Sequence, residues 1–189
     1  LNEITEKLVN KFGPAAFLQV RQMNFYIQRE FSSFLEIIEA DSNKNWFEYA
    51  ALLGEMGEQD KALHLYDSLL IETEENIKKN PDNWVAYGDA GVALAQLGHY
   101  DDAIQMGLKG KELMTLSRDG LLGAQALERL ADIYMYCGRQ DEAIDLYDQV
   151  LSLPGYNSIN WFKLFPKYDP LRDHTRFQKL IAQYSSLSG

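Results

Sequence analysis

Apolar residues recur at spacings of three and four along most of the chain, which is the period of an amphipathic helix. Short polar turns containing Gly, Asn, Asp or Pro separate these segments. The pattern therefore predicts an all-α fold. The helices that it predicts most clearly span about residues 44–56, 59–79, 83–97, 100–115, 121–136 and 140–152.

Three segments repeat one arrangement of small and bulky residues about every forty positions. Each copy places an alanine five residues after a glycine, and the pairs are Gly57/Ala62, Gly98/Ala103 and Gly138/Ala143. A small residue also stands seven positions before each glycine, and a bulky one stands eleven before it. Small residues allow two helices to approach closely, and the glycines suit the left-handed residue that ends a helix. We therefore expect paired, closely packed helices.

This arrangement resembles the tetratricopeptide repeat, in which small, aromatic and glycine positions recur at fixed offsets. The third copy, with Leu130, Ala131, Tyr134 and Tyr147 around its Gly and Ala, fits best. The resemblance covers about residues 43–154 and implies a right-handed superhelical solenoid of about three antiparallel helix pairs. Gly107 departs from the motif because it replaces the aromatic residue, so we expect a thinner helix contact there.

Two flanking regions complete the expected organisation. Residues 1–42 are predicted to form N-terminal helices, with a degenerate helical pair at 14–40 and a short helix before Gly13. Residues 155–189 are predicted to form an extended aromatic loop and then a capping helix that starts near Asp173 as its N-cap. An open solenoid end needs such a cover. The aromatic residues that provide either a cap or a partner-docking patch are Trp161, Phe162, Phe165 and Tyr168.

Charge is divided unevenly along the chain. The net charge of the 189 residues is −10, which argues against non-specific binding to nucleic acid. Residues 1–154 carry 13 basic and 26 acidic residues, whereas residues 155–189 carry 5 basic and 2 acidic ones. The basic tail is therefore an electrostatic partner for the acidic repeats, in the same chain or in a neighbouring one.

Familiar catalytic and metal-binding motifs are missing from the sequence. There is no complete phosphate-binding glycine loop, His-Glu-x-x-His, Cys-x-x-Cys or Gly-x-Ser-x-Gly, and the three histidines are far apart. The single cysteine, Cys137, aligns with apolar positions and is expected to pack rather than react. The sequence therefore predicts no cofactor, no metal and no enzymatic activity.

In stacked helix pairs of this kind, the first helix of each pair lines the concave face. The resemblance therefore implies a set of groove positions that would contact a partner. They are Lys44, Phe47, Ala51, Gly54, Glu55, Val85, Gly88, Val92, Ala95, Gln96, Gln125, Glu128, Asp132, Met135 and Tyr136.

The groove positions are partly apolar and partly acidic. They lack the Lys, Arg and Asn set with which the chaperone-binding members of the family hold a terminal carboxylate. A basic or neutral amphipathic segment suits them better. Alternatively, the chain's own N-terminal helices or a second copy fill the groove.

The run KYDPLRDHTRFQKLIAQY resembles the ending of bacterial multidomain tetratricopeptide proteins that carry a cyclase, kinase or winged-helix domain. That resemblance implies a non-catalytic protein-interaction module of a larger signalling or regulatory protein; self-association is the alternative. The chain starts at Leu1 and shows no signal peptide. We interpret the chain as a fragment of a longer protein. No apolar run approaches 18 residues, so we do not expect this chain to insert into a membrane. We expect it to be cytoplasmic; a membrane anchor elsewhere in the parent protein is the alternative.

Overall fold

The computed structural model describes residues 24–42, 44–153 and 158–186. All the regular secondary structure in these ranges is helical, as the periodicity predicts. The elements are α2 (Phe31–Ala40), α3 (Trp46–Glu55), α4 (Gln59–Lys79), α5 (Trp84–Gln96), α6 (Tyr100–Leu113), α7 (Gly120–Tyr136), α8 (Gln140–Ser152), α9 (Ile159–Leu164), the 3₁₀ helix η1 (Pro166–Leu171) and α10 (Thr175–Ser186).

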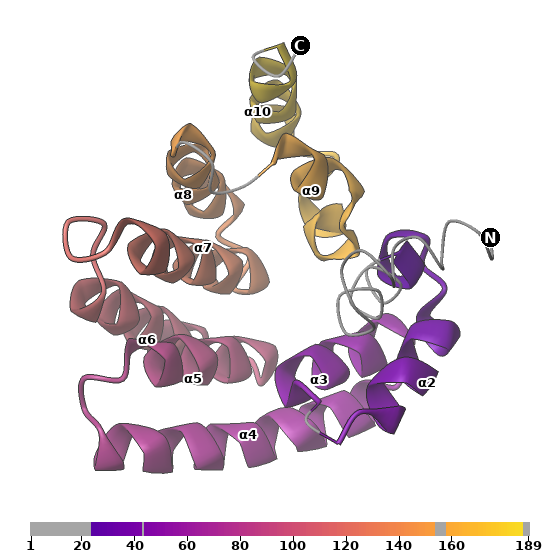
Figure 1. Cartoon of the computed structure of the whole chain (residues 1–189), viewed down its shortest axis with the longest axis vertical. Helices are drawn as coiled ribbons and strands as arrows, with labels where there is room; N and C mark the ends of the chain where they lie inside the picture. Colours follow the sequence, from indigo (N-terminus) through magenta and orange to yellow (C-terminus); the bar gives the residue numbers. More distant parts are fainter. Residues whose placement is uncertain (1–23, 43, 154–157, 187–189) are drawn as a thin grey trace, which may run out of the picture.

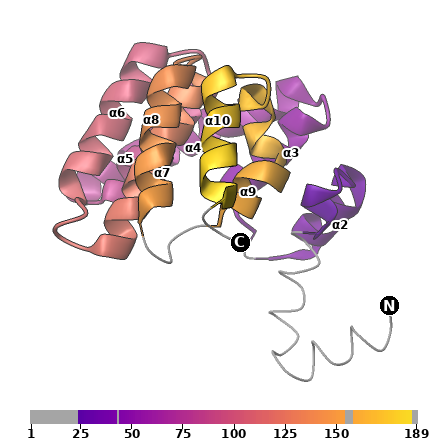
Figure 2. The same cartoon turned by 90° about the horizontal axis from the view of Figure 1, so that it is seen from above.

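Successive helix pairs form an arc. Helix α3 packs on α4, α5 on α6 and α7 on α8, and the pairs join through contacts of α4 with α5 and of α6 with α7. Figure 1 shows α3, α5 and α7 along the inner side of the arc and α4, α6 and α8 along its outer side. The fold is thus an all-α helical repeat of the tetratricopeptide type. Figure 2 shows α10 beside α8, at the end of the stack.

Local sequence signals set where these helices begin and end. Asn45, Asn83 and Asp119 accept hydrogen bonds from backbone N–H groups in the first turns of α3, α5 and α7, as N-cap residues do. The glycines of the three repeats end the first helix of each pair with φ of +82°, +85° and +74°, in the left-handed region that L-residues disfavour. The turn predicted from these glycines is therefore confirmed.

Small residues bring the helices into close contact. Ala50, Ala103, Ala131 and Ala143 have no exposed surface. The thinner contact expected at Gly107 is not found: a Cβ atom added there would lie 2.8 Å from the Cδ1 atoms of both Leu130 and Ile133. Two side chains from α7 therefore occupy the volume that the missing aromatic ring would have filled.

The tail is more regular than the sequence pattern predicts. The expected extended aromatic loop is wrong, since α9 and η1 occupy most of it. Ser158 caps α9 by accepting from the N–H of Asn160, and Pro166 stands at the start of η1, where its missing N–H costs nothing. The capping helix is present as α10. It begins at Thr175, so its N-cap position is His174 and not Asp173 as predicted, and the carbonyl of His174 accepts its first intrahelical hydrogen bond from Gln178.

The N-terminal region is described only in part. Helix α2 and the helical residues 24–27 correspond to the second part of the expected pair at 14–40. Phe34 and Ile38 of α2 are buried with Leu52 of α3, so the described part of this region packs on the first repeat. The short helix predicted before Gly13 lies outside the described residues.

We predict that Gly123→Ala destabilises the fold by about 1–3 kcal/mol, despite the better helix propensity of alanine. An added Cβ would lie 2.5 Å from the backbone nitrogen of Leu116 and from the carbonyl carbon of Thr115, which cannot rotate away. Gly120→Ala is the control, because nothing lies within 4 Å of its Cβ position at the start of the same helix. Urea unfolding of both variants checks this; equal stability of the two would contradict it.

Candidate functional site

The concave side of the arc holds a cavity of about 640 Å³. Helices α3, α5 and α7 contribute to its wall, and so do Tyr26 of the N-terminal region, Tyr66 of α4 and Asn45. The tail adds Trp161, Phe165, Lys167 and Tyr168, so the wall combines repeats, tail and N-terminal region. The predicted groove residues that line it are Phe47, Ala51, Val85, Val92, Glu128, Asp132 and Tyr136.

The wall of this central cavity combines aromatic rings with carboxylates. In the described part of the chain, seven aromatic residues and four acids line it, together with two cationic side chains. Burial raises the pKa of Glu48. Burial also raises the pKa of Asp89, although Arg129, whose guanidinium nitrogen lies 2.8 Å from its Oδ1, opposes that shift. The cavity is thus a partly apolar, acidic site.

Lys167 occupies the acidic end of the cavity. Its Nζ donates to Glu128 at 3.3 Å and to Asp132 at 3.1 Å. Burial acts to lower the pKa of Lys167, but Asp132, Tyr168 and Glu128 outweigh it and hold that pKa well above its usual value. The tail thereby places an ammonium group between two carboxylates of α7.

Hydrogen bonds from two tyrosines hold these carboxylates in place. The Tyr147 hydroxyl donates to Asp132 at 2.6 Å, and the Tyr168 hydroxyl donates to Glu128 at 3.3 Å. Tyr147 is fully buried and Tyr168 nearly so. The acidic end of the cavity is therefore fixed by the core beneath it.

Two smaller cavities adjoin the central one. One of about 400 Å³ is lined by Gly88 and Gln125, together with Val85, Glu128, Asp132 and Lys167. The other, of about 310 Å³, is lined by Gly54, Glu55 and Gln96, together with Ala51, Tyr136 and Lys167. Most predicted groove positions thus face connected space, and Lys167 borders all three cavities.

Three predicted groove positions lie elsewhere. Lys44 lies at the start of α3, with Nζ 4.9 Å from the centroid of the Trp46 ring. Ala95 and Met135 are each 4% exposed and belong to the core. Met135 packs between α7 and α8, where its sulfur lies 3.9 Å from the Tyr147 hydroxyl. Not all of the motif positions line the cavity, because the pairing of helices buries some of their side chains in the core.

The aromatic tail residues divide between two environments. Phe162 and Tyr168 are buried with Tyr147, and their rings contact one another at centroid distances of 4.5–5.4 Å. Trp161 and Phe165 are only partly buried and line the cavity. The tail therefore covers the end of the α7–α8 pair and also forms part of the cavity wall.

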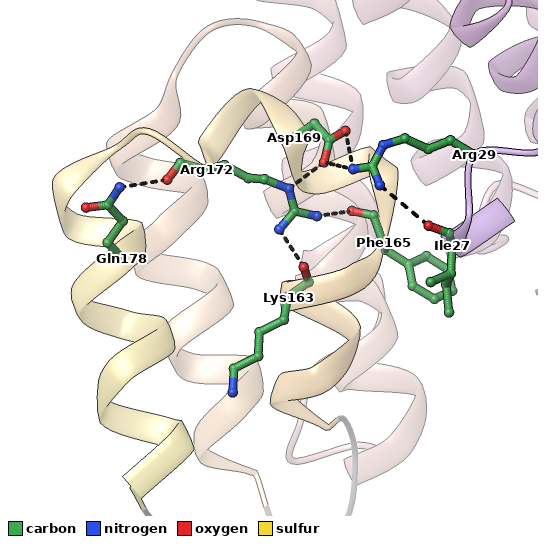
Figure 3. Close-up of polar contacts among 7 residues, drawn as sticks. All are labelled: Ile27, Arg29, Lys163, Phe165, Asp169, Arg172 and Gln178. Atoms are coloured by element: carbon green, nitrogen blue, oxygen red, sulfur yellow. Dashed lines mark hydrogen bonds and ion pairs between the residues drawn. The ribbon is translucent and has the colours of Figure 1, made fainter. Parts of the chain in front are cut away.

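A group of charged residues joins the tail to the N-terminal region. Figure 3 shows Asp169 between Arg29 and Arg172. Both Asp169 oxygens accept from Arg29, at 2.7 and 2.9 Å, while Arg172 also donates to the carbonyls of Lys163 and Phe165. We call Arg29, Asp169 and Arg172 the clasp. It closes the arc across the cavity.

An aromatic contact and a strained backbone accompany the clasp. The ring of Tyr26 meets that of Phe165 edge to face at 5.5 Å. Arg29 has φ of +58°, a left-handed conformation that costs an L-residue about 1 kcal/mol. Its backbone ends a helical turn there, with the N–H of Glu30 donating to the carbonyl of Phe25. An arginine thus stands where glycine is usual, and its side chain reaches the tail.

Lys167, Arg29 and Asp169 are the main residues of the site that motif positions do not indicate. The opposite net charges of the tail and the repeats were the feature of the sequence that could have indicated such contacts. Lys167, which lies between Glu128 and Asp132, is one contact of this kind. Arg176 of the tail makes a second contact of this kind, through ion pairs with Asp141 and Asp145 of α8. Charge alone does not indicate which basic residue meets which acids, since that depends on the path of the tail.

Comparison with known families locates one repeat. Residues 126–155 match the family model of the tetratricopeptide repeat. This stretch includes most of α7 and all of α8, and it is the copy that fits the motif best. No curated protein matches the chain significantly. The match supports a tetratricopeptide protein, a class that is generally non-catalytic and mediates protein interactions.

The described ranges contain no group of three or more His, Cys, Asp or Glu side chains placed to hold a metal ion. Cys137 is half-buried, and burial raises the pKa of its thiol, which disfavours the reactive thiolate. Among the helices of the described ranges, none combines the length and the apolar character needed to cross a membrane.

We predict that the clasp weakens in acid. Burial acts to raise the pKa of Asp169, but its bonds to Arg29 and Arg172 outweigh this and lower that pKa below its usual value. Stability from the clasp is therefore complete above the unfolded pKa of about 4, and it is lost as pH falls through the lower folded value. Urea unfolding should show Asp169→Asn less stable than the wild type at pH 6.

The difference between wild type and Asp169→Asn should shrink towards pH 2–3, where the wild-type carboxyl also becomes neutral. It should also shrink in high salt, because the clasp is partly exposed. Asp173→Asn, a nearby change in the same tail, is the control. A difference that stays constant from pH 6 to pH 2 would refute an electrostatic clasp.

Proposed function

We propose that this chain is a non-catalytic interaction module that binds a peptide, or an extended segment of a partner protein, in its central cavity. The observation that carries the proposal is the wall of that cavity, where aromatic rings and carboxylates from three successive repeats face one space. Such a wall suits an extended segment, because its side chains can meet several repeats at once.

The chemistry of the wall favours a basic, aromatic-containing segment. Four acids against two cations leave the cavity net negative, and partly buried carboxylates attract cations more strongly than exposed ones do. Aromatic rings such as Phe47 and Trp161 offer apolar surface and faces for cation–π contacts. Among the described residues that line it, the basic side chains are Arg129 and Lys167, and both are paired with carboxylates, so a terminal carboxylate is a poor ligand.

The tail supports the proposal that this module is part of a larger regulatory protein. The segment from Lys167 to Tyr184 resembles the ending of bacterial multidomain tetratricopeptide proteins, and here it folds onto the last repeat and reaches the N-terminal region. A module closed in this way presents a defined cavity to a partner while it remains attached to other domains.

Selection of peptides from a random displayed library tests the proposed function. We expect the enriched peptides to carry Lys or Arg beside an aromatic residue. Val85→Arg should weaken their binding about tenfold or more, because Val85 lines two of the cavities and is 43% exposed, so that the added cation would repel the ligand.

Ile71→Arg is the matched control. Ile71 is 57% exposed on α4 and does not line any of the three cavities, so the same substitution there should leave binding unchanged. Circular dichroism would verify that both variants fold. If the selected peptides bind Val85→Arg as tightly as the wild type, binding in the cavity is ruled out.

A further inference from the structure

Lys167 lies in the cavity as the side chain of a bound ligand would. It belongs to the tail, 35 residues along the chain from Asp132 and 39 from Glu128, yet its ammonium group contacts both carboxylates. The acidic subsite is therefore already occupied by a cation of the chain itself.

The surroundings of this ammonium define what the subsite accepts. Glu128 and Asp132 are four residues apart on α7, so they project from the same side of the helix. The Tyr168 ring also lies close, with its centroid 4.9 Å from Nζ. Two carboxylates and a ring face form a site for a primary ammonium or a guanidinium next to an aromatic residue.

The other cation of the cavity is engaged elsewhere. Arg129 pairs with Asp89 of α5 at 2.8 Å. Lys167 forms ion pairs with both Glu128 and Asp132. About a quarter of the Lys167 side chain is exposed, so solvent reaches it. Removal of Lys167 would take the ammonium group away from both carboxylates, while the hydroxyls of Tyr168 and Tyr147 still donate to Glu128 and Asp132.

We propose that Lys167 is an internal competitor, which a Lys or Arg side chain of the partner must displace from Glu128 and Asp132. The inference rests on the proposed function and specifies its regulation. A tail that fills the subsite most of the time reduces the apparent affinity for an external ligand by the fraction of time that the subsite is open. Changes that withdraw the tail would therefore strengthen binding.

Titration by NMR with a short probe tests this competition. The probe is the tetrapeptide Phe-Pro-Arg-Tyr, acetylated and amidated, which copies residues 165–168 with Arg in place of Lys. We expect Lys167→Met to bind it about tenfold or more tightly than the wild type does, since the internal competitor is gone. The same peptide with neutral citrulline in place of Arg should bind both proteins weakly and equally.

Arg176→Met is the matched control. Arg176 is another basic tail residue paired with two acids, Asp141 and Asp145, but these lie on α8 and do not line the cavities. Its loss changes the net charge equally and should leave the affinity for the probe unchanged. Adding Glu128→Gln to Lys167→Met should remove most of the gain. An unchanged affinity in Lys167→Met, or an equal gain in Arg176→Met, would overturn the proposal.

A second measurement uses the wild-type chain and does not depend on how the variants fold. Lys167 should react slowly with an amine-specific acylating reagent in the free protein and faster when the probe is bound, as followed by mass spectrometry. Lys79, which is largely exposed on α4, should react at one rate throughout. An unchanged or slower reaction of Lys167 with the probe bound would contradict its displacement.

The two proposals fail in different ways. If the peptides selected from the library bind Val85→Arg as tightly as the wild type, the proposed function itself is wrong. If Val85→Arg abolishes their binding while the affinity of Lys167→Met stays at the wild-type value, the cavity binds ligands and only the competition by Lys167 is wrong.

Discussion

The apolar end of the α7–α8 pair is the constraint on which the rest of the structure depends. A stack of helix pairs exposes an apolar face at its last pair unless something covers it. Here the tail covers it, and many of the largest fully buried side chains, such as Tyr147, Phe162, Tyr168 and Phe177, belong to this one contact. Because Tyr168 must pack against Tyr147, the neighbouring Lys167 is directed towards the concave face.

The charged side chains that this packing brings together then interact with one another. An acidic inner surface without a counter-charge would be costly, because partly buried carboxylates lose hydration. Lys167 offsets that cost at α7, and Arg129 does so at α5. At the rim, Asp169 binds Arg29 and Arg172, so the two ends of the described chain meet through exposed, salt-sensitive charges. The core of the closed arc is thus apolar, whereas its closure combines this ion-pair group with the aromatic contact of Tyr26 and Phe165.

This division of roles connects structure with the proposed function. The repeats supply a rigid wall, and the tail supplies both a cover for the core and an ammonium group in the cavity. A ligand that replaces the Lys167 ammonium would place its own cation between the same two carboxylates, next to the ring of Tyr168. In the proposed function, recognition and self-occupation use the same carboxylates, Glu128 and Asp132.

The sequence by itself determined the helices of the repeats, since apolar spacings of three and four, N-cap residues such as Asn45 and Asp119, and left-handed glycines are local signals. It also indicated the acidic inner face and the basic tail. The tertiary structure alone decided that the tail is helical, that Met135 lies in the core, and that Arg29 meets Asp169 across 140 residues. Those outcomes depend on long-range packing and on the path of the chain, which no local spacing of residues specifies.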